Sequence, residues 1–168
     1  MSLFVACVGG PMEQVRRWRD EVLAHLSLPH TLICLTDDPD GCEGVTCVDI
    51  TELRLPGPWA KMVLFDQQWR GRSKIIFLDL DIRIKGDLAP LARVPGEFAI
   101  CAGEGGEYDA RVMVIGGGMA GFVWTAFDTR RDEMMRQHKT PAAALAAIYP
   151  GAARLKGVPV ELQQVQRS

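Results

Sequence analysis

Several features that mark common protein classes are missing from this sequence. No five consecutive residues are basic, and 19 lysines and arginines are offset by 21 acidic residues, for a formal net charge of -2. A nucleic-acid-binding domain usually carries an excess of positive charge, so the composition argues against that partner. No apolar stretch reaches the roughly 18 residues of a membrane-spanning helix, and residues 1–5 lead into a predicted strand, not a signal peptide. We therefore expect a cytoplasmic protein without a transmembrane segment.

The cysteines lack the spacing of a zinc site or a disulfide framework. Their number, five, is odd, and no two are separated by two residues. They are Cys7, Cys34, Cys42, Cys47 and Cys101. Most lie in apolar surroundings, so buried, reduced thiols are the expected state. The Gly-x-Ser-x-Gly elbow of many serine hydrolases is missing as well, which argues against that chemistry.

What the chain does contain is an alternation of apolar runs and amphipathic segments. Of its 168 residues, 48% are hydrophobic and 24% are charged, which is typical of one globular domain. Apolar runs typical of strands occupy residues 3–8, 30–35, 45–50, 73–78, 98–103 and 158–165. Helical patterns occupy residues 12–26, 59–69, 128–138 and 140–149, and two strand-like halves flank a glycine run within residues 110–127. The alternation predicts an α/β fold with a mostly parallel sheet flanked by helices.

Two carboxylates, Asp79 and Asp81, directly follow the apolar run at residues 73–78. Ligands of open α/β sheets bind beyond the carboxyl ends of the strands, and the alternation of side chains sends both aspartates to one side while Leu80 turns away. Like charges held so close are costly unless a cation neutralises them. Oxygen ligands favour Mg²⁺ or Mn²⁺, which usually also bind substrate phosphates. The triplet therefore predicts a metal site, with a solvated turn as the alternative.

Several sequence blocks around this triplet resemble one known family. Bacterial glycosyltransferases with the GT-A fold, close to glycosyltransferase family eight, carry similar blocks in the same order and spacing: PHTLICLTDDPDGCEGV, PGPWAKMVLF, GRSKIIFLDLDIRIKGDLAPL and FAIC. The resemblance covers residues 3–103. It implies a single GT-A-like domain over residues 1–168, with a mostly parallel mixed sheet, a nucleotide-binding half at residues 1–103 and a shortened acceptor-side half at residues 104–168.

The resemblance also implies roles for individual residues, although it assigns no catalytic residue. The donor would be a nucleotide sugar, most plausibly of uridine diphosphate. The implied donor-binding residues are Ala6, Cys7, Val8, Thr36, Asp37, Asp38, Lys61, Asp79 and Leu80. Asp79 and Asp81 would hold Mn²⁺ or Mg²⁺ on the donor diphosphate, where the ion stabilises negative charge as the bond between the sugar and the diphosphate breaks. Lys61 is expected near the diphosphate or the donor sugar or, alternatively, on the solvent side of a helix.

The second half departs from the family pattern at two points. Family members carry an Asn-Ser-Gly or Asn-Ala-Gly block whose amide contacts the sugar, but the counterparts here, Met119-Ala120-Gly121 or Tyr108-Asp109-Ala110, lack the asparagine. Many relatives also have a C-terminal segment whose histidine completes the metal site. The late histidine of this chain, His138, is expected to be a metal ligand or, alternatively, a solvated residue at a helix end.

Two classes of function remain. The first is a metal-dependent hexosyltransferase that moves a sugar from a nucleotide-diphosphate donor to an unknown acceptor, which would be a glycan, a lipid or a protein. The second is a non-catalytic module of the same fold that binds a protein partner or another copy of itself, with Trp124 and Phe127 as candidate contact residues. The complete first half favours the enzyme, and the shortened second half favours the module. A glycosidase is disfavoured, because Asp79 and Asp81 share one face and leave no room for a sugar between them.

Overall fold

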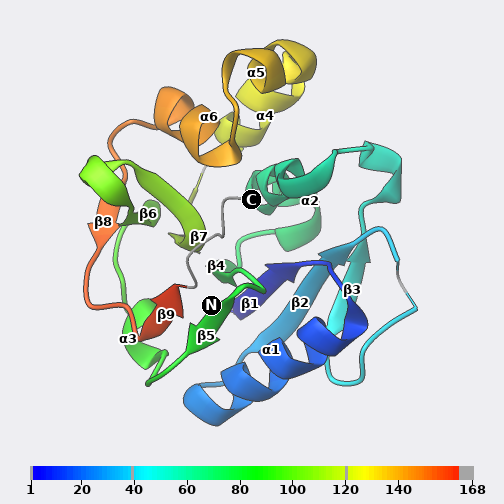
Figure 1. The fold of residues 1–168 in the computed structure, drawn as a ribbon, viewed down its shortest axis with the longest axis vertical. Coiled ribbons are helices and arrows are strands. Elements are labelled where there is room, and N and C mark those ends of the chain that lie inside the picture. Colours follow the sequence, from blue (N-terminus) through cyan, green and yellow to red (C-terminus); the bar gives the residue numbers. More distant parts are fainter. Residues whose placement is uncertain (1, 39, 120, 163–168) are drawn as a thin grey trace.

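The computed structural model describes residues 2–38, 40–119 and 121–162, which form an α/β fold with two sheets (Figure 1). The strands of the main sheet are β1 (Leu3–Val8), β2 (Thr31–Thr36), β3 (Thr46–Asp49), β4 (Lys74–Leu78), β6 (Phe98–Ala102), β7 (Tyr108–Ile115) and β8 (Ala153–Leu155). The second sheet pairs β5 (Ile82–Ile84) with β9 (Val160–Leu162). The α-helices are α1 (Met12–His25), α2 (Gln67–Arg70), α3 (Ala89–Ala92), α4 (Phe122–Asp128), α5 (Arg131–Gln137) and α6 (Pro141–Ile148). The 3-10 segments are η1 (Thr51–Leu53), η2 (Gly57–Phe65) and η3 (Glu104–Gly106).

The main sheet has the strand order β3-β2-β1-β4-β7-β6-β8. β1 lies between β2 and β4 and is parallel to both, and β3 is parallel to β2. β7 runs antiparallel to β4 and β6, whereas β8 is parallel to β6. The predicted mostly parallel, mixed sheet is therefore confirmed.

Both faces of the main sheet are buried, because helical segments cover each of them. Val5 and Cys7 of β1 belong to a core that includes residues of α1, whereas Ala6 belongs to a second core with η2, α4 and α6. The buried Trp18 of α1 donates its indole N–H to the carbonyl oxygen of Leu78, 3.0 Å away, which fixes the helix against the end of β4. In Figure 1, α4, α5 and α6 gather at one end of the molecule and α1 lies at the other.

The predicted helix at residues 59–69 is divided into two elements. Residues 57–65 form the 3-10 segment η2, and the short helix α2 follows. Asp66 separates them, because its side chain accepts the backbone N–H of Gln68 at 3.0 Å and caps α2. The division matters for the site, since η2 carries Lys61.

Residues 122–127 were predicted to be strand-like, but they form most of helix α4. Val123 and Phe127 lie four residues apart and are both fully buried, which is the spacing of one helical face. Phe127 stacks on Trp59 of η2, with ring centroids 5.7 Å apart. As a core residue it is not a surface contact for a partner, whereas Trp124 packs at the margin of the same core.

The end of the described chain follows the prediction more closely. α6 begins as expected, with the hydroxyl of Thr140 accepting the backbone N–H of Ala143 at 3.1 Å and with Pro141 in the first turn. The predicted last strand is represented by β9, and residues 163–165 of that prediction lie outside the described residues. β8 was not anticipated. All five cysteines carry free thiols, as expected.

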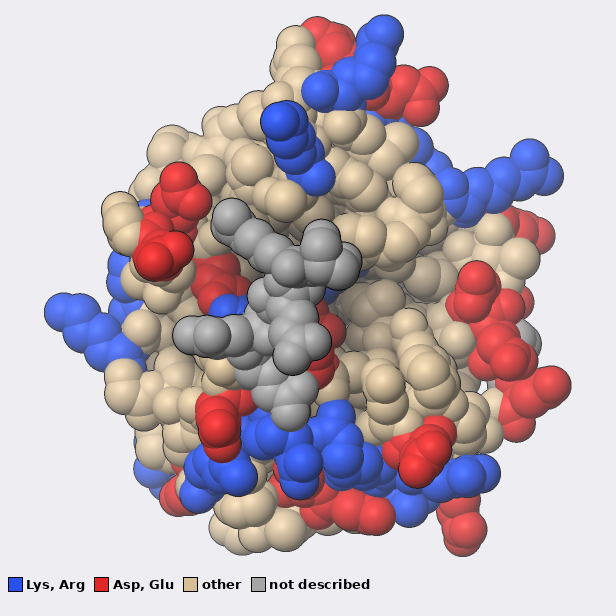
Figure 2. Space-filling view, in the orientation of Figure 1, with Lys and Arg blue, Asp and Glu red and all other residues tan. Residues whose placement is uncertain are grey.

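Charged side chains of both signs are mixed on the surface. Figure 2 shows basic side chains along the lower part of the molecule, the region of α1 and β5 in Figure 1, with acidic side chains among them. Glu21 of α1 pairs with Arg17 at 3.1 Å and with Arg83 of β5 at 2.7 Å. Much of the positive charge here is therefore neutralised locally. Within the described part of the chain, no helix has the length and apolar character needed to cross a membrane.

Candidate functional site

One edge of the main sheet brings the Asp-x-Asp triplet next to the start of β7. The carboxyl ends of β1, β2, β3 and β4 lie at this edge, and β7 begins there because it runs in the opposite direction. The backbone N–H of Asp79 donates to the carbonyl oxygen of Arg111 on β7, 2.9 Å away. Residues from both halves of the chain therefore meet at the triplet.

Asp79 is held by two contacts. Its Oδ1 accepts the backbone N–H of Leu80 at 2.8 Å, and its Oδ2 lies 2.5 Å from Nζ of Lys61. Only 22% of the Asp79 side chain and 13% of the Lys61 side chain are exposed. The same Nζ lies 5.6 Å from the centre of the Phe77 ring. Lys61 therefore points into the site and not out to solvent.

Asp109 and Arg111 add a second ion pair that the sequence analysis did not place in the site. The two Arg111 nitrogens Nε and Nη2 donate to the Asp109 carboxylate, with Nη2 2.7 Å from Oδ2. Burial raises the pKa of Asp109, but hydrogen bonds from Arg111 outweigh it, and the net pKa is lowered. The hydrogen bond to Asp109 in turn raises the pKa of Arg111. Both groups are therefore charged at neutral pH.

Asp81 differs from its two carboxylate neighbours. Partial burial of the carboxyl group and the negative charge of Asp79 raise the pKa of Asp81, while the charges of Arg111 and Lys61 oppose that shift. Its residue is solvent-exposed. Asp81 is therefore the accessible carboxylate of the group and the one whose charge is least neutralised.

We define these five side chains, Lys61, Asp79, Asp81, Asp109 and Arg111, as the charged cluster. Three carboxylates face two cations, so one negative charge remains in excess. Such a cluster attracts a divalent cation, and it repels a free diphosphate unless the diphosphate arrives with a metal ion.

The residues of the charged cluster fit a metal ion whose coordination is completed by a substrate. Mg²⁺ and Mn²⁺ are commonly bound through one or two carboxylates together with phosphate oxygens and waters, which matches Asp79 and Asp81. A cation beside Asp81 would offset the burial and the charge of Asp79 that raise the pKa of this carboxyl group. Among the described residues, no three acidic, histidine or cysteine side chains are arranged to hold a metal ion by themselves. His138, at the end of α5, joins no such group.

A cavity of about 260 Å³ opens at the same edge, beyond β1 and β2. Val8, Thr36, Asp37 and Ala60 are among its lining residues, and Ala60 directly precedes Lys61. The cavity lining is completed by Gly9, Leu35, Ile50, Thr51, Arg54, Leu55 and Gly57. The volume suits a flat ring system, and the position suits the ligand site of an open α/β sheet.

The turn after β2 shapes one wall of this cavity. The Thr36 hydroxyl accepts the backbone N–H of Asp38 at 3.0 Å, which turns the chain outward. A Cβ atom at Gly9 would lie 2.7 Å from Oγ1 of Thr36, so this close approach of the two strand ends requires glycine. Asp37 lines the cavity, whereas Asp38 is exposed beside it.

Three of the residues named for donor binding are buried away from the cavity. Ala6 and Cys7 have exposed fractions of 0% inside β1, so of the β1 residues named for donor binding only Val8 lines the cavity. Hydrogen bonding to Cys34 and burial raise the pKa of Cys7, which keeps its thiol protonated. Leu80 is buried between the two aspartates, and its carbonyl oxygen accepts from the guanidinium of Arg17.

Comparisons with known proteins find similarity in structure alone. No family model matches the sequence, and no curated protein matches it either. The glycosyltransferase GlyE of Streptococcus pneumoniae TIGR4 superimposes with a TM-score of 0.68 at 18% identity, over 92% of this chain and 45% of GlyE. The chain thus spans less than half of the length of GlyE.

Two further structures support the same conclusion. The galactosyltransferase LgtC, solved in complex with donor and acceptor sugar analogues, matches with a TM-score of 0.61 at 13% identity, over 93% of this chain and 73% of LgtC. Mouse xyloside xylosyltransferase 1 matches with a TM-score of 0.60 at 11% identity, over 92% of this chain and 84% of that protein. The chain therefore has the GT-A-like fold of these glycosyltransferases, as its sequence blocks predicted.

Proposed function

We propose that this protein is a metal-dependent glycosyltransferase that moves a hexose from a nucleotide-diphosphate donor, most plausibly a uridine diphosphate sugar, to an acceptor. The observation that carries the proposal is the juxtaposition, at one edge of a GT-A-like sheet, of the 260 Å³ cavity and the charged cluster. The cavity has room for the nucleoside. The cluster then lies where the diphosphate and the sugar would follow.

Different residues of the charged cluster would bind different parts of the donor. Asp79 and Asp81 would hold Mn²⁺ or Mg²⁺, and a bound ion would stabilise negative charge on the departing diphosphate. The ammonium group of Lys61 lies 2.5 Å from Asp79, where it could exchange this carboxylate for a phosphate oxygen as its ion-pair partner. Asp109 and Arg111 offer an acceptor and a donor of hydrogen bonds toward sugar hydroxyls, in place of the asparagine amide that the family pattern carries.

We place the acceptor on the second half of the chain, residues 104–168, with the nucleotide on residues 1–103. A cavity of about 420 Å³ lies between the start of β7 and α6, and Tyr108, the neighbour of Asp109, lines it. The remaining lining residues are mainly small and apolar, namely Thr140, Ala142, Ala143, Ala146 and Pro150, and Glu107 and Arg154 complete the lining. Such a surface suits an acceptor with one apolar face.

One observation favours the alternative function, a non-catalytic binding module. Asp79 and Asp109 are both neutralised by partners from this chain, Lys61 and Arg111. In a purely structural role, the Lys61–Asp79 pair would join η2 to the end of β4, the Asp109–Arg111 pair would brace β7, and neither would exchange partners. The two functions predict different responses to a nucleotide.

The decisive experiment measures thermal stability with uridine diphosphate, with and without Mn²⁺. A ligand that binds the native state raises the unfolding midpoint, so the transferase should be stabilised by the nucleotide and Mn²⁺ together. Asp81→Asn removes one ligand charge and should abolish the stabilisation and lower donor hydrolysis by roughly a hundredfold or more. Asp132→Asn, on the exposed start of α5, is the matched control and should behave like the parent. A flat response in the parent protein would favour the binding module.

A further inference from the structure

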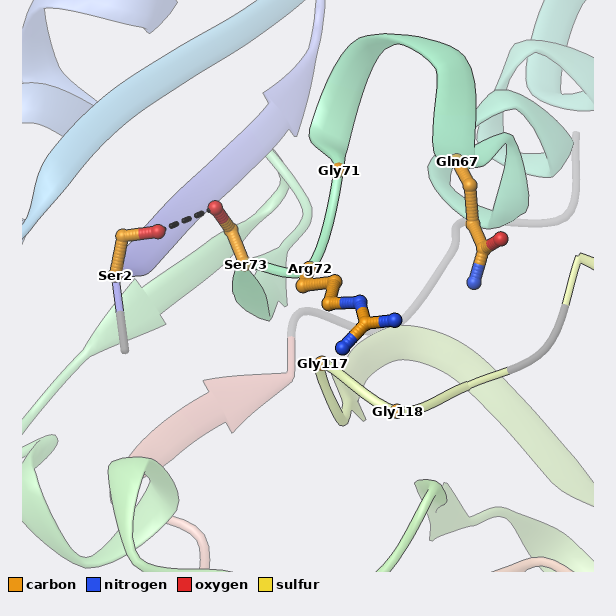
Figure 3. Close-up of a pocket in the computed structure, with 7 residues that line it drawn as sticks. All are labelled: Ser2, Gln67, Gly71, Arg72, Ser73, Gly117 and Gly118. Atoms are coloured by element: carbon orange, nitrogen blue, oxygen red, sulfur yellow. Dashed lines mark hydrogen bonds between the residues drawn. The ribbon is translucent and has the colours of Figure 1, made fainter.

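A third cavity lies at the edge of the main sheet opposite the charged cluster (Figure 3). Ser2 and Ser73 precede β1 and β4 at this edge, and Gly117 and Gly118 follow β7, which ends there because it is antiparallel to β4. The cavity has a volume of about 860 Å³, which is within the range of small-molecule sites. Its lining residues are Ser2, Gln67, Gly71, Arg72, Ser73, Gly117 and Gly118. None of these has an apolar side chain, so the cavity suits a polar ligand.

Buried hydrogen bonds fix two walls of this cavity. The guanidinium of Arg70 donates to the carbonyl oxygens of Ser73 at 3.3 Å, Gly116 at 3.4 Å and Met119 at 3.2 Å. The side-chain amide of Gln67 also donates to the carbonyl oxygen of Met119. These bonds tie the turn after α2 to the loop between β7 and α4. The cavity is therefore held open by the fold.

Arg70 brings a positive charge that is not matched by a carboxylate. The residue is 2% exposed, and within the described part of the chain it forms no ion pair and its Nε has no hydrogen-bond partner. Burial lowers the pKa of Arg70, and the charge of Asp66 opposes the shift. A buried cation held only by carbonyl oxygens is costly, and a nearby anion would stabilise it.

Arg72 brings a second positive charge to the same place. Its residue is exposed, and Figure 3 shows its guanidinium extending toward Gly117 and Gly118. Among the described residues, this guanidinium has no hydrogen-bond or ion-pair partner. A Cβ atom at Gly71 or Gly118 would meet nothing within 4 Å, so the space at both of these lining glycines is open.

We propose that this cavity binds a small phosphorylated molecule, with Arg72 contacting the phosphate group. The planar guanidinium forms strong, charge-assisted hydrogen bonds to phosphate, and the charge of Arg70 behind the wall adds to the attraction. A volume of about 860 Å³ exceeds the needs of a free phosphate ion. The hydroxyl groups of Ser2 and Ser73, which share a hydrogen bond of 2.5 Å, and the side-chain oxygen of Gln67 can contact a polar body such as a sugar. The site does not depend on the proposed transferase function, because it occupies the other edge of the sheet.

The test measures binding by calorimetry at constant ionic strength without divalent metal, using glucose 6-phosphate, glucose and inorganic phosphate as probes. Glucose 6-phosphate should bind at least tenfold more tightly than glucose. Arg72→Gln should weaken that binding by roughly tenfold, since it removes the charge of the phosphate contact. Arg16→Gln, on the exposed face of α1, is the matched control and should not change it. Asp81→Asn should have no effect either, which separates this site from the proposed donor site.

A second variant keeps the test independent of Arg72. Gly118→Asp places a negative charge at an open position and should abolish glucose 6-phosphate binding while the unfolding midpoint stays at the parent value. Inorganic phosphate should bind more weakly than glucose 6-phosphate, and equally tight binding of the free ion would overturn the proposal of a larger phosphorylated ligand. Equal binding of glucose and glucose 6-phosphate, or equal effects of Arg72→Gln and Arg16→Gln, would overturn the proposal.

Discussion

At the scale of single residues, Lys61 competes with any metal ion for the carboxylate of Asp79. The ammonium group lies 2.5 Å from Oδ2 of Asp79, so an incoming cation meets a carboxylate that is already paired. Among the described residues, Asp81 has no such ion-pair partner to give up, and its pKa is raised. In the proposed transferase, the pair would therefore favour metal binding together with an anionic ligand, because the diphosphate would offer Lys61 a new partner.

Lys61→Met tests this exchange. Without the ammonium group, Asp79 should be available to a metal ion, and the affinity for Mn²⁺ alone should rise by roughly threefold to tenfold. The affinity for uridine diphosphate in saturating Mn²⁺ should fall, because the diphosphate loses a cation. Electron paramagnetic resonance of free Mn²⁺ measures the first quantity and calorimetry the second. Lys139→Met, on an exposed turn, serves as the control, and an unchanged Mn²⁺ affinity in Lys61→Met would contradict the exchange.

At the scale of elements, η2 links the hydrophobic core to the site. Trp59 of η2 stacks on Phe127 of α4, with ring planes 6° apart, and Lys61 follows two residues later. Packing against α4 therefore helps to fix the position of a residue of the charged cluster.

Phe127→Ala should remove this packing. Truncation of a fully buried phenylalanine costs about 3 to 5 kcal/mol, and urea denaturation should show a loss of that size in the free energy of unfolding. Phe122→Ala provides a control in the same helix, because Phe122 is 45% exposed and its loss should cost about 1 kcal/mol or less. Equal losses in the two variants would show that the stack on Trp59 is not a main support of α4.

Burial also explains which elements could be predicted from the sequence. β1, β2 and β4 are covered on both faces, so they read as continuous apolar runs. Residues 122–127 are equally apolar, and only their packing against η2 and α6 distinguishes a helix from a strand.

The same reasoning applies to the site. Asp79 and Asp81 could be predicted because they follow a strand directly. Asp109 and Arg111 could not, since they join the cluster only through the antiparallel pairing of β7 with β4, which is a long-range contact. The third cavity was missed for a similar reason, because its lining comes from α2 and the turn after it and from the ends of β1, β4 and β7, and no single motif marks it.

At the scale of the whole molecule, two neighbouring carboxylates should affect stability in opposite directions. The pKa of Asp81 is raised in the folded protein, so the native state binds more protons than the unfolded state and stability falls as pH rises through the pKa values of this group. The pKa of Asp109 is lowered, so its contribution is present at neutral pH and is lost as pH falls.

Thermal unfolding between pH 3 and pH 7 measures both effects. Asp81→Asn should be more stable than the parent at pH 7 and equal to it at the acidic end. Asp109→Asn should be less stable than the parent at pH 7, because Arg111 loses its carboxylate partner, and the difference should shrink as pH falls. Changes of the same sign in both variants at pH 7 would contradict the electrostatic account of the cluster.

The central place of β1 has a consequence for the time course of folding. β1 is synthesised before β4, and Leu3 lies opposite Lys74 of β4, about 70 residues later. At about 5 to 20 residues per second, a ribosome needs roughly 4 to 14 seconds to make that intervening segment. During this interval β1 can pair with β2 but not with β4, so one edge of an almost wholly apolar strand has no partner. Contacts of such long sequence separation also slow refolding, and we expect a chaperone that shields extended apolar segments to raise the yield of folded protein.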